Sequence, residues 1–258
     1  MRSDQNPDQT PTRLRDYTPP GWLVEHVNLV CDLAPSATRV RTAIRFRRNG
    51  GTDLELHGRK LVLVSASVDG RDVTADCVTD REGLRLAGPL PDEFLWECET
   101  EIDPESNTEL EGLYLSKGMF CTQCEAEGFR KITFYPDRPD VMAVFDVRIE
   151  ADIIDQPVLL SNGNPTAQGR LAGGRHFAEW HDPHPKPAYL FALVAGNLVS
   201  HDDSFTTASG RHVDLKIWVR PGDEAKCAYA MDALIRSMRW DEEAYGREYD
   251  LDLFQIVA

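Results

Sequence analysis

The chain has 258 residues, of which 41% are hydrophobic and 28% are charged. This composition is typical of soluble globular proteins and excludes a collagen, a coiled coil or a disordered chain. At about 150 residues per domain, the length predicts one large domain or two modest ones. The 43 acidic and 28 basic side chains give a formal net charge of −15. This charge disfavours nucleic acid and anionic lipid as partners, because both would be repelled.

The acidic side chains are concentrated in one stretch of the chain. Residues 92–127 hold eleven acids and a single base, Lys117. Such a stretch can attract a cationic ligand, or it can be a solvated face that only aids solubility. The residues alone leave both interpretations open.

The N-terminal region carries no targeting signal that we recognise. The first twenty residues contain no apolar segment of the kind found in signal peptides, and we expect residues 1–16 to form a flexible tail. The longest apolar run, 188–196, is about half the length of a membrane span. Six cysteines are few for a chain of this size. We therefore expect a cytoplasmic protein with free thiols and no integral membrane association.

Alternation of apolar and polar residues predicts an antiparallel β domain after the tail. The segments with this period-two pattern are 27–33, 40–46, 61–68, 94–102 and 145–151. Asp69-Gly70 is a strong signal for a two-residue hairpin turn, and another turn is expected at 161–164. Between these turns, residues 108–140 lose the alternation and gather Gly, Pro and aromatic residues. A long irregular segment inside a β domain is usually functional.

The pattern changes to β followed by α after Asn197. A strand is predicted at 213–219 and then a helix, with Asp223 as its N-cap and Gly246 at its end. The apolar face of this helix is expected to comprise Cys227, Met231, Leu234, Met238 and Tyr245. We place a domain boundary near residue 198, which gives domains at 17–197 and 198–258. The last apolar run is expected to be a strand, and its abrupt end suggests a truncated chain.

Two pairs of potential metal ligands occur at short spacings. Cys121 and Cys124 form a C-x2-C pair, and His181 and His184 form an H-x2-H pair. This arrangement fits no zinc finger, so the four residues are either one zinc site or two free thiols and two loop histidines. No H-E-x-x-H, Walker, G-x-G-x-x-G or G-x-S-x-G motif occurs. By itself the chain carries no complete catalytic apparatus.

The irregular segment contains an amide and two carboxylates at alternate positions, Gln123, Glu125 and Glu127. If the backbone is extended there, the three side chains lie on one side and could bind an ammonium group by charge-assisted hydrogen bonds. Alternatively, nearby bases neutralise the two carboxylates as part of the structure: Arg130, Lys131 or Arg138.

Several blocks of sequence resemble the N-terminal domain of the bacterial cytoplasmic members of the aminopeptidase N family. The members of this family are zinc-dependent gluzincin aminopeptidases. The blocks are TQCEAEGFR at 122–130, YPDRPDV at 135–141, NTELEGLY at 107–114, LLSNGN at 159–164, YLFALVAG at 189–196 and WDEE at 240–243. The resemblance runs from about Tyr17 to the last residue.

The resemblance implies a fold and a function. It implies a mainly β fold, with a saddle-like antiparallel β domain followed by the first strands and helix of an α+β, thermolysin-like catalytic domain. It implies removal of single N-terminal residues from peptides with a free N-terminus, by a full-length enzyme that is monomeric. The family's exopeptidase loop and the ligands of its one Zn2+ would lie beyond residue 258. We therefore expect no catalytic residue and no metal ligand in this chain, and no activity from it alone.

The resemblance also implies roles for two residues, since Gln123 and Glu125 match the family's Gln-x-Glu element. In the family the Glu binds the α-amine of the substrate and the Gln lines the first side-chain pocket. Glu127 matches no functional position, and a cis peptide bond is expected between Glu125 and Ala126. The alternative function is a stand-alone β-rich module that binds cationic peptides through its acidic loop.

Overall fold

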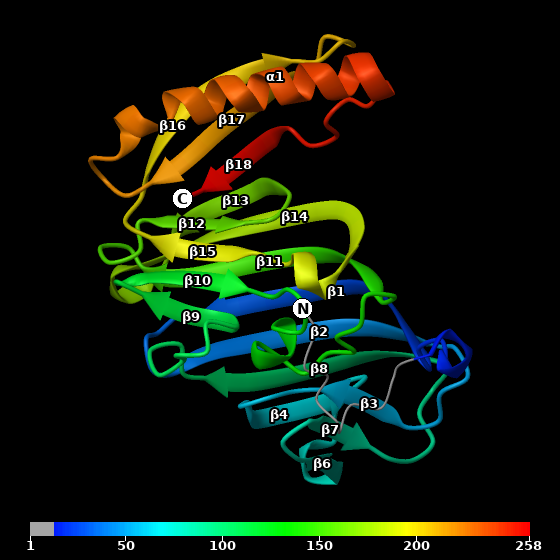
Figure 1. Ribbon diagram of the computed structural model, residues 1–258. Coiled ribbons are helices and arrows are strands. Elements are labelled where there is room, and N and C mark those ends of the chain that lie inside the picture. The colour runs from blue at the N-terminus through cyan, green and yellow to red at the C-terminus, as the bar shows by residue number, and fades with distance from the viewer. Residues whose placement is uncertain (1–12) are drawn as a thin grey trace, which may run out of the picture.

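The computed structural model describes residues 13–258, and its largest element is a twisted eight-stranded sheet (Figure 1). In spatial order its strands are β13 (Asn164–Arg170), β14 (Arg175–Pro187), β11 (Met142–Asp152), β1 (Trp22–Asp32), β2 (Thr38–Arg48), β8 (Glu93–Ile102), β4 (Val62–Val68) and β5 (Arg71–Asp72). Neighbouring strands are antiparallel, except that β1 and β11 run parallel. The prediction of a mainly β fold is confirmed, but the expectation of a purely antiparallel domain is wrong at this central pair.

The predicted strands form because their alternation buries one face. In β1, for example, the buried residues Val27, Leu29 and Cys31 alternate with three more exposed residues, Asn28, Val30 and Asp32. The Asp69-Gly70 turn joins β4 to β5 as predicted. Both residues have positive φ, 50° and 76°, as a tight two-residue hairpin turn requires.

Two smaller sheets share the core of the large sheet. One has the order β12 (Val158–Ser161), β15 (Leu193–Gly196), β10 (Met119–Gln123), β9 (Gly112–Ser116), and the other has the order β3 (Leu54–His57), β7 (Gly83–Leu86), β6 (Cys77–Thr79). A single cluster of buried residues runs through all three sheets. Its largest fully buried side chains are Trp96, Tyr135, Phe46, Phe94, Phe120, Phe129 and Phe145.

The irregular segment contributes directly to this core. The ring of Phe129, in the short 3-10 helix Phe129–Lys131 (η3), packs edge-on against Tyr135 at 5.0 Å and Phe191 at 5.2 Å between ring centroids. Aromatic pairs favour this edge-to-face arrangement. Buried aromatic rings therefore attach the irregular segment, residues 108–140, to the core.

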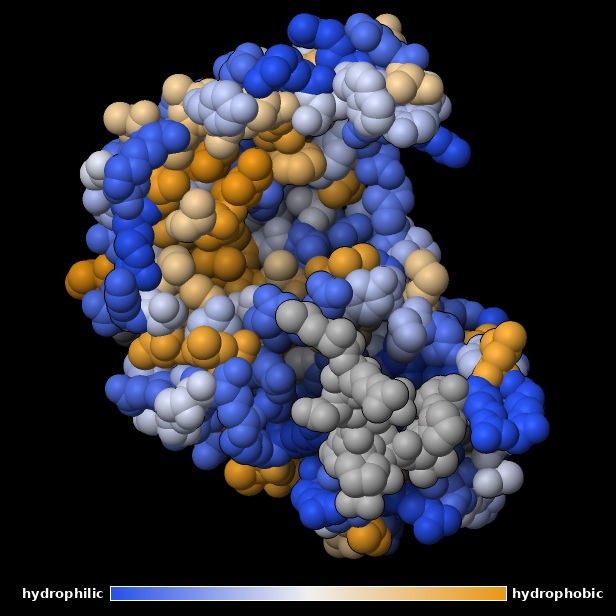
Figure 2. Space-filling model, viewed as in Figure 1, coloured by the Kyte–Doolittle hydropathy of each residue, from blue (hydrophilic) through white to orange (hydrophobic). Residues whose placement is uncertain are grey.

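The last sixty residues form a second unit with its own core, at the top of Figure 1. Strands β16 (Val199–Thr206), β17 (His212–Val219) and β18 (Leu253–Val257) form a three-stranded sheet, and helix α1 (Ala228–Tyr245) packs on it. Figure 2 shows apolar side chains gathering in the hollow between this unit and the strands below it. The groove between β18 and the β12 and β15 strands is lined in part by Leu160, Val194 and Phe254.

The predicted helix is present, but its start and its apolar face differ from the prediction. Gly246 ends it in the left-handed conformation, with φ 63°, as predicted. Asp223 is not its N-cap, because a short 3-10 turn, Glu224–Lys226, intervenes and α1 begins only at Ala228. Tyr245 does not join the buried face. It is 65% exposed and packs edge-on against Trp240.

Two further findings concern the N-terminal tail and membranes. Of the predicted tail, residues 1–12 lie outside the described residues, and Leu14–Asp16 forms a 3-10 turn. Across residues 13–258, no helix combines the length and the apolar character needed to cross a bilayer.

Candidate functional site

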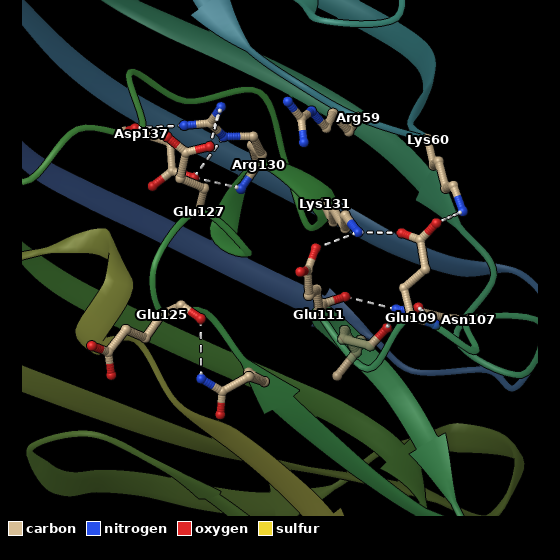
Figure 3. A network of polar contacts seen from close by, with 12 residues as sticks. Arg59, Lys60, Asn107, Glu109, Glu111, Glu125, Glu127, Arg130, Lys131 and Asp137 are labelled. Carbon is tan, nitrogen blue, oxygen red and sulfur yellow. Dashed lines mark hydrogen bonds and ion pairs between the residues drawn. The ribbon is translucent and has the colours of Figure 1, made fainter. Parts of the chain in front are cut away.

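Gln123 and Glu125 come together at the end of strand β10. The strand ends at Gln123, and the chain then turns over residues 125–128. Cys124 between them is buried, whereas both candidate side chains are exposed. The Gln123 amide nitrogen Nε2 donates to the backbone carbonyl of Glu125 at 3.2 Å (Figure 3). The peptide bond between Glu125 and Ala126 is cis, as predicted from the resemblance.

The turn that carries Glu125 is fixed by contacts on both sides. Before it, the Thr122 hydroxyl accepts from the N–H of Leu193 at 2.8 Å and donates to the carbonyl of the same residue at 3.1 Å. After it, the N–H of Gly128 donates to the carbonyl of Cys124 at 2.8 Å. A Cβ at position 128 would lie 2.2 Å from the Gln123 carbonyl oxygen, so only glycine fits there. These contacts therefore hold the backbone of the turn that carries the exposed Glu125 side chain.

Glu127 does not share the side of Gln123 and Glu125. The expectation that all three lie together is wrong, because the chain is not extended beyond Gln123. The Glu127 carboxylate lies 3.2 Å from Nη1 of Arg130, whereas Glu125 points away from this pair (Figure 3). Of the three bases considered for neutralising Glu125 and Glu127, only Arg130 contacts either of these two carboxylates within the described residues, and that contact is with Glu127.

Arg130 is the centre of a buried polar network. Its Nε lies 3.0 Å from the Asp137 carboxylate, and its Nη2 donates to the Asp137 carbonyl at 2.9 Å. The two side chains are only 7% and 3% exposed. Buried charges persist in proteins when they are paired and hydrogen-bonded in this way. The network fixes the segment after the Glu125 turn to the core.

Five other acids of the 92–127 stretch also have basic partners. The buried ammonium of Lys131 contacts Glu109 and lies 2.6 Å from Glu111, and Lys60 lies 2.6 Å from Glu109 (Figure 3). The hydrogen bonds from these two lysines lower the pKa of Glu109 to about 2. Further ion pairs join the stretch to β2: Arg39 with Glu99 and Glu101, and Arg48 with Asp92.

Glu125 has no ion pair with any residue in the described part of the chain, and the same holds for four other exposed acids of the stretch, Glu93, Glu97, Asp103 and Glu105. Six of the eleven acids are thus compensated by bases from other segments. This finding weakens the interpretation of the stretch as one broad cationic-ligand surface. Glu125 differs from the other unpaired acids because it lies beside the Gln123 amide on a turn that is fixed on both sides, which is an arrangement that can bind an ammonium group.

Comparison with known proteins identifies the family. The model of the Peptidase M1 N-terminal domain matches residues 38–190, which is more than half of the chain. This chain belongs to the peptidase M1 family. It is 57% identical to aminopeptidase N of Caulobacter vibrioides over 95% of its length, and 48% identical to aminopeptidase N of Escherichia coli over 94%. These relatives agree with the resemblance to aminopeptidase N.

Solved structures of the M1 family share the fold. Aminopeptidase A of Legionella pneumophila, determined in complex with aspartic acid, superposes with a TM-score of 0.90 at 32% identity, over 95% of this chain and 30% of that one. The chain spans about 28% of the length of the curated aminopeptidase N relatives that it matches. It corresponds to their N-terminal domain.

The residues present do not fit a zinc site. Nowhere in residues 13–258 do three or more His, Cys, Asp or Glu side chains converge to hold a metal ion. Both histidines of the H-x2-H pair lie in strand β14 rather than in a loop, and each contacts a carboxylate: His181 with Asp146 at 2.5 Å and His184 with Asp250 at 3.2 Å. Burial raises the pKa of the Cys124 thiol, which disfavours the thiolate that a metal needs.

Proposed function

We propose that this chain is the substrate-recognition part of a zinc-dependent aminopeptidase that removes single N-terminal residues from peptides. The observation that carries the proposal is the isolated carboxylate of Glu125. It is exposed and has no ion pair within residues 13–258, while the neighbouring Glu127 is paired with Arg130. A carboxylate in this state can accept charge-assisted hydrogen bonds from the α-ammonium group of a peptide.

In this proposal Glu125 positions the substrate and takes no part in breaking the bond. By holding the ammonium group, it sets the distance from the N-terminus to the first peptide bond, so that one residue is removed. A blocked N-terminus carries no charge and loses the contact. The zinc ligands and bond-cleaving groups implied by the resemblance lie outside this chain.

Gln123 is proposed to line the pocket for the first side chain of the substrate. Its amide nitrogen is engaged by the Glu125 carbonyl at 3.2 Å, which fixes the orientation of the side chain. The amide oxygen remains available as an acceptor. The same hydrogen bond links the two recognition residues, so that they act as one preorganised element.

We further propose a domain boundary near residue 198, a cytoplasmic location and a monomeric full-length enzyme. The boundary is supported by the second core, whose buried residues lie between 205 and 238, while Leu253 of β18 and Trp218 of β17 join this unit to the core of the preceding sheets. The location is proposed from the similarity to bacterial aminopeptidase N.

The test is Glu125→Ala in the complete enzyme, assayed on an alanyl arylamide. Loss of a charge-assisted contact is expected to lower kcat/KM by about 2–4 kcal/mol, or roughly 30-fold to 1000-fold. Glu127→Ala is the matched control and should keep wild-type kinetics, because Glu127 pairs with Arg130 instead of facing the substrate. Wild-type kinetics for Glu125→Ala would contradict the proposal.

A second measurement addresses the alternative of a stand-alone module. The 258-residue chain is titrated calorimetrically with a tetralysine peptide. The aminopeptidase proposal expects no tight binding, because in it a single carboxylate, that of Glu125, contacts the ammonium group, and six of the eleven acids of the stretch already have bases as partners. Tight binding that Glu105→Gln or Glu111→Gln weakens would instead support the module.

A further inference from the structure

A cavity of about 470 Å³ lies where three sheets meet. Its walls come from β12, from the β13–β14 hairpin, and from β17 and β18 of the second unit. Ligand pockets in proteins commonly have volumes between about 300 and 1,000 Å³ and are mainly apolar with a few polar groups. None of the lining residues belongs to the segment 123–130.

The walls are rich in aromatic and aliphatic side chains. Phe177, Trp180 and Trp218 contribute rings, and Leu159 and Leu253 contribute aliphatic surface. Trp218 is oriented by its indole N–H, which donates to the side-chain oxygen of Gln255 at 3.0 Å. Such walls suit a flat apolar molecule, because aromatic pairs gain energy beyond the burial of their area.

One polar group of the cavity has unused hydrogen-bonding capacity. Trp180 is only 5% exposed and its indole nitrogen is fully buried, so this residue contributes ring surface to the wall. The Lys216 ammonium lies 2.9 Å from Asp202 and 5.8 Å from the centre of the Trp218 ring. Because an ammonium has three N–H donors, one carboxylate contact leaves others free.

We propose that this cavity binds a small aromatic carboxylic acid. The aromatic body of the ligand packs between the indole rings of Trp180 and Trp218. Its carboxylate accepts from the free N–H donors of Lys216 and supplies the negative charge that complements this ammonium group. Since the walls come from both units, the ligand bridges the large sheet and the second unit.

The test is NMR of the 258-residue chain with 15N-labelled indole groups, titrated with 1-naphthylacetate. The chain has five tryptophans, and their resonances are assigned by Trp→Phe variants. Saturable shifts are expected for Trp180 and Trp218, with Trp22, Trp96 and Trp240 unchanged. No shift at Trp180, or equal shifts at exposed Trp240, would overturn the proposal.

Two variants and a second probe test the chemistry. Lys216→Met should weaken binding of 1-naphthylacetate at least tenfold, while the exposed Lys226→Met should leave it unchanged. 1-Naphthylmethylamine, which has the same ring and the opposite charge, should bind at least tenfold more weakly to the wild type. Ala178→Leu adds bulk to a wall of the cavity and should abolish binding. If that variant fails to fold, equal binding of 1-naphthylacetate by wild type and Lys216→Met still overturns the proposal.

Discussion

Glu125 and Glu127 are two residues apart, yet they belong to different parts of the molecule. Glu127 faces Arg130, a base that is held in the core by Asp137. Glu125 faces away, on a turn fixed by Thr122 and Gly128, and has no ion pair in residues 13–258. The comparison teaches that an acid in this stretch is structural where a buried base supports it, and is available to a ligand where none does.

The largest effect is expected at the buried base. Arg130→Met leaves the Asp137 carboxylate buried without its partner, and breaking a buried pair in this way typically costs about 3–5 kcal/mol. We expect a decrease of that size in the free energy of unfolding of the chain, measured by urea denaturation. Arg45→Met, at an exposed position of β2, is the control and should change stability little. A loss below about 1 kcal/mol for Arg130→Met would show that the network is not structural.

Lys131 should show a smaller effect of the same kind. Its side chain is 7% exposed, but its partners Glu109 and Glu111 are 45% and 53% exposed and remain hydrated when the lysine is removed. Lys131→Met should therefore cost about 1–2 kcal/mol in urea denaturation. The exposed Lys117 offers a matched control, Lys117→Met. Equal stability of the two variants would contradict the structural role of Lys131.

The ion pairs of Glu109 make the stability of the fold depend on pH. Its pKa in the folded state is about 2, below the ordinary 4.5, because Lys131 and Lys60 donate to it. Its ionised form therefore stabilises the fold above pH 4.5, and this contribution is lost as the pH falls from 4.5 towards 2. Glu109→Gln should lose less stability than wild type between pH 5 and pH 3, compared by urea denaturation at each pH. Glu105→Gln, at an exposed acid, should keep the wild-type profile, and identical acid profiles for all three proteins would contradict the prediction.

The smallest effect is expected at Glu125 itself. Glu125→Gln removes a charge that contacts no base in the described residues, so the free energy of unfolding should change by no more than about 0.5 kcal/mol. This result would separate its role in recognition from any role in stability. A loss above 1 kcal/mol would mean that Glu125 supports the fold.

Local signals predicted most of the β architecture. Alternation located β1, β2, β4, β8 and β11, because one face of each strand is buried. Asp69-Gly70 located a hairpin turn, because both positions need positive φ. The parallel pairing of β1 with β11 could not be predicted in this way. His26 and Val144 are paired, but nothing in either strand specifies a partner so distant in sequence.

In the candidate site, too, local signals predicted one part and contacts that form only in the folded chain decided the rest. The idea that Gln123, Glu125 and Glu127 share one side assumed an extended backbone, but residues 125–128 form a turn closed by the hydrogen bond from Gly128 to Cys124. The joint role of Gln123 and Glu125 in recognition, and the cis bond after Glu125, were expected from the family resemblance rather than from the pattern of residues. The supporting pair of Arg130 and Asp137 was missed, because only the folded chain shows that the two charges are buried together.

The parallel contact between β1 and β11 has a consequence for how the large sheet is assembled. On one side of this contact lie β1, β2, β8, β4 and β5, all from residues 22–102, and on the other lie β11, β14 and β13, from residues 142–187. The sheet is therefore two antiparallel halves joined along a single parallel contact. Because this contact closes a loop of more than a hundred residues, we expect it to form late in folding. A deletion of Trp22–Asp32 would divide the sheet at its middle rather than trim its edge.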